Sequence, residues 1–190
     1  KNLKDCSAPN LWDEYFRLAE NDIHQQWDEI IWPLIKFSDF SNVLEIAPGG
    51  GRNTEKLLKL TNNIQLVDLN EYAIKKCKER FKNKTTLRYH INNGKSLPMI
   101  YPESVSFIYS WDAFVHFSPT VIHNYIAEFA RILKPGGTCY IHHSNYGLNP
   151  NANDDFKMNP HWRSNMSGQL MNNFCFYSGL RCFKQSIISW

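Results

Sequence analysis

Three consecutive glycines, Gly49, Gly50 and Gly51, directly follow the apolar segment 42–47. A glycine-rich passage between a strand and a helix lets the backbone approach a ligand closely, because no Cβ atom stands in the way. Asp68 ends the next apolar segment, about twenty residues after the glycines, where a carboxylate accepts hydrogen bonds from ribose hydroxyls. Alone, the glycines also fit a tight turn and Asp68 a helix cap. Together they predict a site for a nucleotide-type cofactor.

The spacing of these glycines separates two classes of cofactor. Dinucleotide-binding enzymes place a third glycine inside the helix, in the order Gly-x-Gly-x-x-Gly. If Gly49 and Gly51 open that motif, Thr54 stands at the position of the third glycine. The pattern therefore disfavours a nicotinamide-dependent oxidoreductase, which stays an alternative.

Histidines and one aspartate follow two later apolar segments. Asp112 and His116 come after residues 104–111, and His142 and His143 come near the end of a further apolar run. Adjacent residues of a strand point to opposite faces, so only one of the paired histidines can face a site. His143 is preferred as a general base because it is nearer the strand end, and His142 is the close alternative. Asp112 orients a hydroxyl or a histidine, or caps a turn.

The segment 159–167 brings His161, Trp162 and Arg163 together in one predicted loop. An aromatic ring beside an arginine can hold a sugar or a phosphorylated or carboxylated compound. The same residues also fit a surface loop that Trp162 anchors to the core. His116 binds substrate or packs behind the site. The histidines and Asp112 show no ligand spacing typical of a metal site, so we expect no metal.

Strands and helices must alternate to position these residues. The expected strands are 42–47, 63–69, 85–91, 104–111, 137–145 and 181–190, and the expected helices are 52–60, 71–81, 118–133 and 167–180. Such alternation predicts an α/β fold, a three-layer α/β/α sandwich around a mainly parallel, Rossmann-like sheet. Ser118 should cap its helix and Pro119 should stand in the first turn.

Residues 1–40 have a helical pattern, with apolar side chains that begin at Leu11, Trp12 and Tyr15 and recur further on at Phe16, Ala19 and later positions. Asn21 and Asp22 could cap a second helix, which Pro33 should bend or end. We expect one domain over residues 1–190, in which 1–40 form a helical cover and 41–190 the cofactor-binding core.

The segment Glu45-Ile46-Ala47-Pro48-Gly49-Gly50-Gly51 resembles the first motif of class I S-adenosylmethionine-dependent methyltransferases. The resemblance runs over roughly residues 42–145. It includes Asn93–Pro98, with Asn93 at a usually acidic position, the segment from Ser110 to Phe117, and the turn Leu133–Gly137. Proteins of this family normally end in an antiparallel seventh strand, for which no segment follows residue 190. A truncated chain, a substitute segment or a sheet edge paired in a homodimer would each account for this.

The resemblance implies S-adenosyl-L-methionine as cofactor. It also implies the residues that contact it: Glu45, Ala47, Gly49, Gly51, Asp68, Leu69, Asn93, Gly94 and Trp111. The acceptor would then lie among His116, His142, His143 and the loop of His161, Trp162 and Arg163. The chain is also similar to bacterial methyltransferases found among glycan-modifying genes. We therefore expect O-methylation of a sugar or small-molecule hydroxyl with a histidine base; a catalytically inactive cofactor-binding domain is the alternative.

The composition of the chain bears on its partners and its cellular compartment. The formal net charge of +3 is too small for the strongly basic face of most nucleic-acid binders. The five cysteines are scattered and odd in number, which is typical of a reducing compartment. No apolar run approaches the ~20 residues of a membrane span. We therefore expect a cytoplasmic enzyme that acts on small molecules or glycans.

Overall fold

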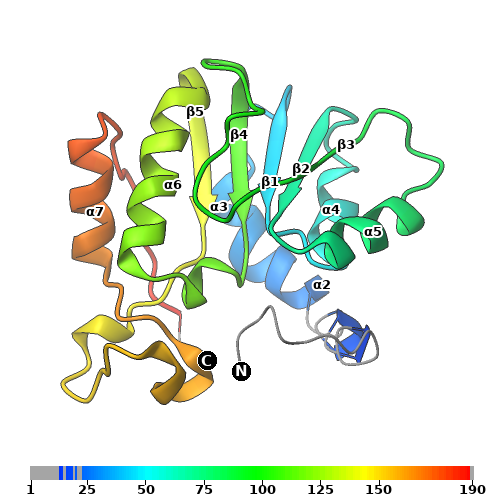
Figure 1. Cartoon of the computed structure of the whole chain (residues 1–190). Helices are drawn as coiled ribbons and strands as arrows, with labels where there is room; N and C mark the ends of the chain where they lie inside the picture. The colour runs from blue at the N-terminus through cyan, green and yellow to red at the C-terminus, as the bar shows by residue number, and fades with distance from the viewer. Residues whose placement is uncertain (1–12, 15, 19, 21–22, 189–190) are drawn as a thin grey trace.

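The computed structural model describes residues 13–14, 16–18, 20 and 23–188 (Figure 1). Its centre is a parallel five-stranded sheet in the order β3-β2-β1-β4-β5. The strands are β1 Val43–Ile46, β2 Ile64–Asp68, β3 Arg88–Ile91, β4 Val105–Ser110 and β5 Leu133–Ile141. The helices are α2 Ile23–Gln25, the π-helical Gln26–Ile31, α3 Trp32–Ile35, α4 Arg52–Leu57, α5 Glu71–Arg80, α6 Pro119–Ile132 and α7 Gly168–Tyr177. Short 3-10 turns lie at Phe114–His116, Tyr146–Leu148, Phe156–Met158 and Pro160–Trp162.

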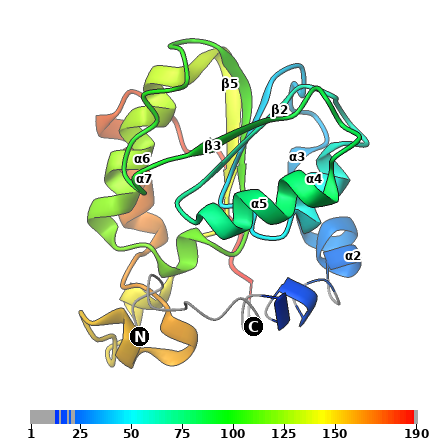
Figure 2. The ribbon, with the colours of Figure 1, turned by 45° about the vertical axis from the view of Figure 1, so that its right-hand side comes forward.

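Helices cover both faces of the sheet, so the predicted three-layer α/β arrangement is confirmed (Figures 1 and 2). The two faces carry separate apolar cores because strand side chains alternate in direction. Leu44 and Ile108 pack toward α6 and α7, whereas Val43, Phe107 and Tyr109 pack toward the helices of the other face. Burial of β1, β2 and β4 on both sides explains their nearly continuous apolar sequences.

The predicted helix starts follow from local hydrogen bonds. Ser118 accepts a hydrogen bond from the amide of Val121 at 3.4 Å, and Pro119 occupies the first turn of α6, as predicted. Ser167 caps α7 through the amide of Leu170. Asn70 caps α5, which leaves Asp68 without that role.

The fifth strand differs from its prediction of 137–145. It begins at Leu133 and ends at Ile141, with a register shift opposite Val105 and Phe107. The turn that was expected to precede the strand therefore lies within it as an irregularity, where the chain must bulge to stay paired. His142 and the residues after it consequently lie beyond the strand.

The prediction of a sixth strand at 181–190 is wrong for its described part, because residues 181–188 have no strand pairing. A strand needs a neighbouring ladder. A cavity of about 1220 Å³ instead separates this segment from β5. Among its hydrogen bonds are one from Gln185 to the carbonyl of Gly168 and one from Cys182 to Lys184, and none in the described chain joins it to β5.

The predicted N-terminal helical segment is helical at residues 13–14, 16–18 and 23–35, and Glu20 lies in a turn. Leu11, Trp12, Tyr15, Ala19 and the cap at Asn21 and Asp22 lie outside the described residues. Pro33 does not end the helix, which continues to Ile35. Six π-helical residues, Gln26–Ile31, precede α3, and proline has no amide to continue the regular pattern. No helix in the described ranges is long and apolar enough to cross a bilayer.

Gly147 follows β5 and packs against the backbone of Asn165, where only glycine fits. A Cβ atom there would lie 2.1 Å from the carbonyl oxygen of Asn165, which backbone atoms cannot easily relieve. We expect Gly147→Ala to lower the free energy of unfolding by about 1–3 kcal/mol in urea denaturation. Gly168→Ala is the control, because its Cβ would meet only the flexible end of Gln185. Equal stability of the two variants would contradict this account.

Candidate functional site

The carboxyl ends of all the strands lie along one edge of the sheet. Figures 1 and 2 show the N-terminal helical residues on one side of this edge and the segment 146–166 on the other. Open parallel sheets bind ligands at this edge, where neighbouring connections turn in opposite directions. Between β1 and β4 the connections do so, since β2 and β3 lie on one side and β5 on the other.

The glycine loop after β1 has a backbone that few side chains permit. Ala47, Gly49 and Gly51 have φ values of 57°, 57° and 86°. A Cβ atom on Gly51 would lie 2.6 Å from the ring of Phe81, so only glycine fits there. The ring of Phe16 lies close to Gly49 and Gly50, 3.2 Å from where their Cβ atoms would stand. The N-terminal segment therefore covers this loop.

Asp68 lies against the glycine loop. Its carboxylate accepts a hydrogen bond from the amide of Asn70 at 2.8 Å, and the amides of Gly49 and Leu69 also favour its charged form. Burial nevertheless raises the pKa of Asp68 to about 6, because it disfavours the charged form more than these bonds favour it. When it is ionised, the carboxylate offers only acceptors, as ribose hydroxyls require.

Glu45 is buried beneath the loop, with 2% of its surface exposed. The hydroxyl of Thr54 donates to its carboxyl group at 2.6 Å, which ties β1 to α4 across the glycines. Burial raises the pKa of Glu45 to about 7. The residue therefore organises the loop from below and is protonated over part of the pH range in which most carboxyls are charged.

The turn after β3 places Asn93 and Gly94 beside the end of β2. The side-chain carbonyl of Asn93 accepts from the amides of Lys95 and Ser96, both at 2.9 Å. Gly94 has a φ of 73°, and a Cβ there would lie 3.4 Å from Leu69. Leu69 is 48% exposed, so it offers an apolar surface near Asp68.

Trp111 and His142 stack at the ends of β4 and β5, with ring centroids 4.3 Å apart. The indole nitrogen of Trp111 donates to the side-chain carbonyl of Gln26 at 3.1 Å, so the N-terminal helical segment fixes the ring. His142 is 8% exposed. Burial and the nearby charge of Arg163 lower the pKa of His142 to about 3, which keeps its ring neutral.

Asp112 joins the two halves of the site. Its backbone has a φ of 62°, a strained value for aspartate. Arg52, the first residue of α4, donates to its carboxylate at 3.2 Å, and Nδ1 of His142 lies 3.9 Å from it. Asp112 thus binds the first residue of the helix behind the glycine loop and lies near the histidine after β5.

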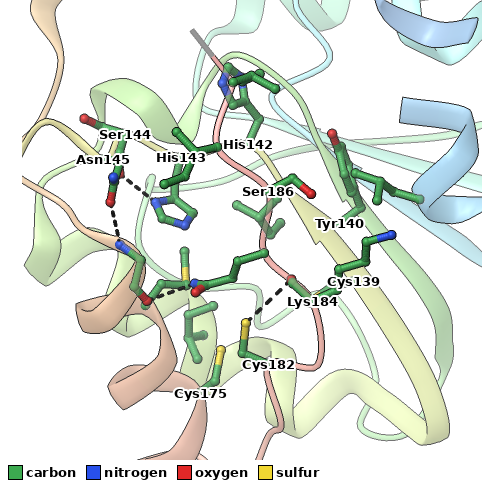
Figure 3. A pocket seen from close by; sticks show the side chains of 18 of the residues that line it. Cys139, Tyr140, His142, His143, Ser144, Asn145, Cys175, Cys182, Lys184 and Ser186 are labelled. Carbon is green, nitrogen blue, oxygen red and sulfur yellow. Dashed lines mark hydrogen bonds between the residues drawn. The ribbon is translucent and has the colours of Figure 1, made fainter. Parts of the chain in front are cut away.

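The ring of His143 makes a different contact from that of His142. Its Nδ1 lies 2.7 Å from the carbonyl oxygen of Ser144 (Figure 3). Because a carbonyl only accepts, Nδ1 carries the proton and Nε2 has the free electron pair. Burial lowers the pKa of His143. The cavity beside it runs along β5, α7 and the C-terminal segment.

The segment 146–166 is held to the rest of the site by polar contacts, of which that of Ser144 is buried. Nδ1 of His116 donates to the carbonyl of Trp162 at 3.0 Å, and the amide of Ser164 donates to Val115 at 2.8 Å. Ser144, 2% exposed, donates to the carbonyl of Ser164. His161 and Trp162 have φ values of 50° and 53°, so two strained residues follow each other at the site.

The structure therefore brings half of the predicted site residues together in two groups. The glycine loop, Glu45 and Asp68 form one group, and His142, Asp112 and Trp111 form the other. Sequence reasoning missed three contributors: Phe16, Gln26 and Arg52. Arg52 follows the glycines directly, a place that could have drawn attention to it, whereas the contacts of Phe16 and Gln26 depend on tertiary packing. In the described part of the chain, no three His, Cys, Asp or Glu side chains gather as metal ligands.

Comparison with known proteins agrees with this geometry. A family profile described as "Methyltransferase domain" matches residues 43–137, from β1 to the turn in β5. No curated protein matches the chain by sequence.

Several solved structures have a similar fold. An O-methyltransferase family protein from Burkholderia thailandensis has a TM-score of 0.67 and 15% identity, over 96% of this chain and 57% of that one. Protein PH0226 from Pyrococcus horikoshii has a TM-score of 0.59 and 21% identity, over 70% and 66%. Geranyl diphosphate C-methyltransferase from Streptomyces coelicolor, solved with S-adenosyl-L-homocysteine, has a TM-score of 0.60 and 14% identity, over 72% and 50%. The matches thus span between half and two thirds of these structures.

The buried Glu45 should make stability depend on pH. Between its ordinary pKa of 4.5 and about 7, the folded protein holds a proton that the unfolded chain has released, so stability falls as pH rises. Between about pH 5 and about pH 7.5, the free energy of unfolding of Glu45→Gln should rise by about 1–3 kcal/mol relative to that of the parent protein, as urea unfolding would measure. Asp68 is buried in both proteins, and its charge is one of the causes that raise the pKa of Glu45. A constant difference across this range would contradict the raised pKa.

Proposed function

We propose, from the premise that this chain belongs to the S-adenosylmethionine-dependent methyltransferases, that it methylates a hydroxyl of a sugar or another small molecule with a histidine as general base. The observation that carries the proposal is the group His142, Asp112 and Arg52, which lies directly beside the glycine loop. A neutral histidine next to the cofactor loop is what removal of a hydroxyl proton requires.

The residues of the first group fit the cofactor. Asp68 would accept the ribose hydroxyls, and the loop Ala47–Gly51, whose own side chains are small, would pass beside the methionine part, with the ring of Phe16 close to Gly49 and Gly50. Leu69 would cover one face of the adenine, and Gly94 and Asn93 would close its edge. When it is bound, S-adenosylmethionine supplies a methyl group on a positively charged sulfur.

His142 is better supported as the base than His143, although His143 stands nearer the end of the segment. The carboxylate of Asp112 lies on the Nδ1 side of His142, which would hold the proton on Nδ1 and leave Nε2 to accept one from the acceptor hydroxyl. The distance of 3.9 Å is loose, as catalytic contacts often are before a ligand binds. His143 contacts a backbone carbonyl and lies beside the cavity along β5.

The positions of the other residues predicted to bind the methyl acceptor support a small molecule in that role. Trp162 is 48% exposed and strained, and His116 fixes its carbonyl. An exposed ring held by a fixed backbone is a suitable face for a sugar. His161 and Arg163 line the adjoining cavity.

One observation favours the second candidate, a cofactor-binding domain without catalysis. The pKa of His142 is lowered to about 3, which makes it a weak base in the ligand-free protein. In that case the chain would bind the cofactor and transfer no methyl group to any hydroxyl.

The outer edge of β5 supports a further proposal, a homodimer formed through the sheet edge. In the described ranges, β5 pairs only with β4. Unpaired edge groups are available to a second chain.

The base is tested with paired histidine variants. We expect His142→Ala to lower methyl transfer from labelled S-adenosylmethionine to a panel of sugars and small hydroxyl compounds by about 10²–10⁴-fold. His143→Ala should have a smaller effect, because its ring contacts neither Asp112 nor Trp111. Both variants should bind S-adenosylhomocysteine as the parent does. The reverse order would assign the base to His143, and absence of transfer by the parent protein would favour the second candidate.

The ribose contact is tested at Asp68. Loss of a charged acceptor should weaken binding of S-adenosylhomocysteine by about tenfold to a hundredfold in Asp68→Ala, as calorimetry would measure. Asp28→Ala, an exposed residue of the π-helical segment, is the matched control. Unchanged affinity in Asp68→Ala would remove Asp68 from the cofactor site.

A further inference from the structure

Helix α5 holds two consecutive carbonyl groups of the glycine loop. The thiol of Cys77 donates to the carbonyl of Gly49 at 3.3 Å, and the guanidinium group of Arg80 donates to that of Gly50 at 3.1 Å. A peptide unit is planar and trans, so a fixed carbonyl also fixes the direction of the amide that follows it. Side chains of α5 therefore orient two neighbouring peptide groups of the loop.

The guanidinium group of Arg80 also binds two carboxylates, which come from different parts of the chain. One belongs to Glu55 of α4, the helix that follows the loop, and the other to Glu20 of the N-terminal segment. The side chain of Arg80 is 29% exposed, so solvent screens these ion pairs only in part. Arg80 thus joins the glycine loop, α4 and the N-terminal segment through one group.

Two further side chains of α5 extend the contact with the N-terminal segment. The hydroxyl of Tyr72 donates to the carboxylate of Asp13 at 2.9 Å, and the ammonium group of Lys76 lies 2.8 Å from the same carboxylate. The three side chains of α5 that bind the N-terminal segment are spaced four residues apart, so they share one face of the helix. Asp13 and Glu20 therefore fix this segment to α5 on either side of Phe16, whose ring lies on the glycine loop.

We propose that Arg80 is a positioning residue for the cofactor: it holds the glycine loop and the N-terminal segment together in the arrangement that binds S-adenosylmethionine. The inference rests on the proposed function and concerns the same site. Glycines lose more conformational freedom on ordering than other residues do. Contacts that order the loop before the cofactor arrives therefore lower the cost of binding it.

The chemistry of the guanidinium group fits this role. Its donors lie in a fixed plane and point in several directions, so it can bind two carboxylates and a carbonyl at once. The ammonium group of a lysine is a compact point charge on a flexible chain. Arg80→Lys therefore keeps the charge and loses the geometry, whereas Arg80→Gln loses both.

Calorimetric titration of the full chain with S-adenosylhomocysteine, at low and at high sodium chloride, tests the proposal. At low salt, we expect Arg80→Gln to weaken binding by about threefold to thirtyfold, and Arg80→Lys to recover part of the loss. High salt should weaken binding by the parent more than binding by Arg80→Gln, because it screens ion pairs that the variant has already lost. Lys75→Gln, which removes an exposed ion pair with Glu79 on the same helix, is the matched control and should bind as the parent does.

A double-mutant cycle tests whether Glu20 acts through Arg80. Glu20→Gln alone should weaken binding, and in Arg80→Gln it should cause no further loss, because the partner of Glu20 is then absent. Amide hydrogen exchange of the glycine loop, measured without ligand on the same samples, should be faster in Arg80→Gln than in the parent or in Lys75→Gln.

Three results would overturn the proposal. They are equal affinity of the parent and Arg80→Gln, a fully additive loss in the double variant, and unchanged exchange of the glycine loop in Arg80→Gln. Failure of the parent to bind S-adenosylhomocysteine would defeat the proposed cofactor and this inference with it. Binding by the parent, with equal affinity in Arg80→Gln, would defeat this inference alone.

Discussion

The buried hydrogen bond between Thr54 and Glu45 is the contact on which the site depends. It joins the end of β1 to α4 beneath three glycines, whose backbone would otherwise have many accessible conformations. A carboxyl group in this place costs free energy to bury, and the raised pKa of Glu45 reflects that cost. The same contact holds α4 against β1. Arg52, the first residue of α4, reaches Asp112 after the end of β4. One buried contact therefore fixes the glycine loop to the helix that carries Arg52.

Strain gathers at the same edge of the sheet. Ala47, Asp112, His161 and Trp162 all have positive φ values, and all four lie in segments that follow β1, β4 or β5. Such conformations persist only where surrounding contacts determine them. Here those contacts are visible: the amide of Ala47 donates to Val67, Arg52 holds Asp112, and His116 holds the carbonyl of Trp162. The binding edge is stiff because its neighbours are well packed.

Local patterns in the sequence predicted much of the fold. The continuous apolar runs gave the strands β1, β2 and β4, and Ser118 and Ser167 marked the starts of α6 and α7, because these signals act over a few residues. The prediction of a sixth strand failed because pairing depends on a distant neighbour: residues 181–188 include apolar and aromatic side chains, yet a cavity separates them from β5. The glycine loop and Asp68 were predicted to form a cofactor site from their spacing along the chain, and that role stays a prediction. The link from Arg52 through Asp112 to His142, and the cover that Phe16 forms over the glycines, could not be found in that way, since they join residues that meet only after folding.

The central claim is that the glycine loop and Asp68 hold S-adenosylmethionine. Calorimetric titration of the full chain with S-adenosylhomocysteine, with NAD and NADP titrated in parallel, tests it most directly. The account predicts saturable binding of S-adenosylhomocysteine at one site for each chain, and no binding of either dinucleotide. Binding of NAD or NADP in its place, or no binding of S-adenosylhomocysteine, would contradict it.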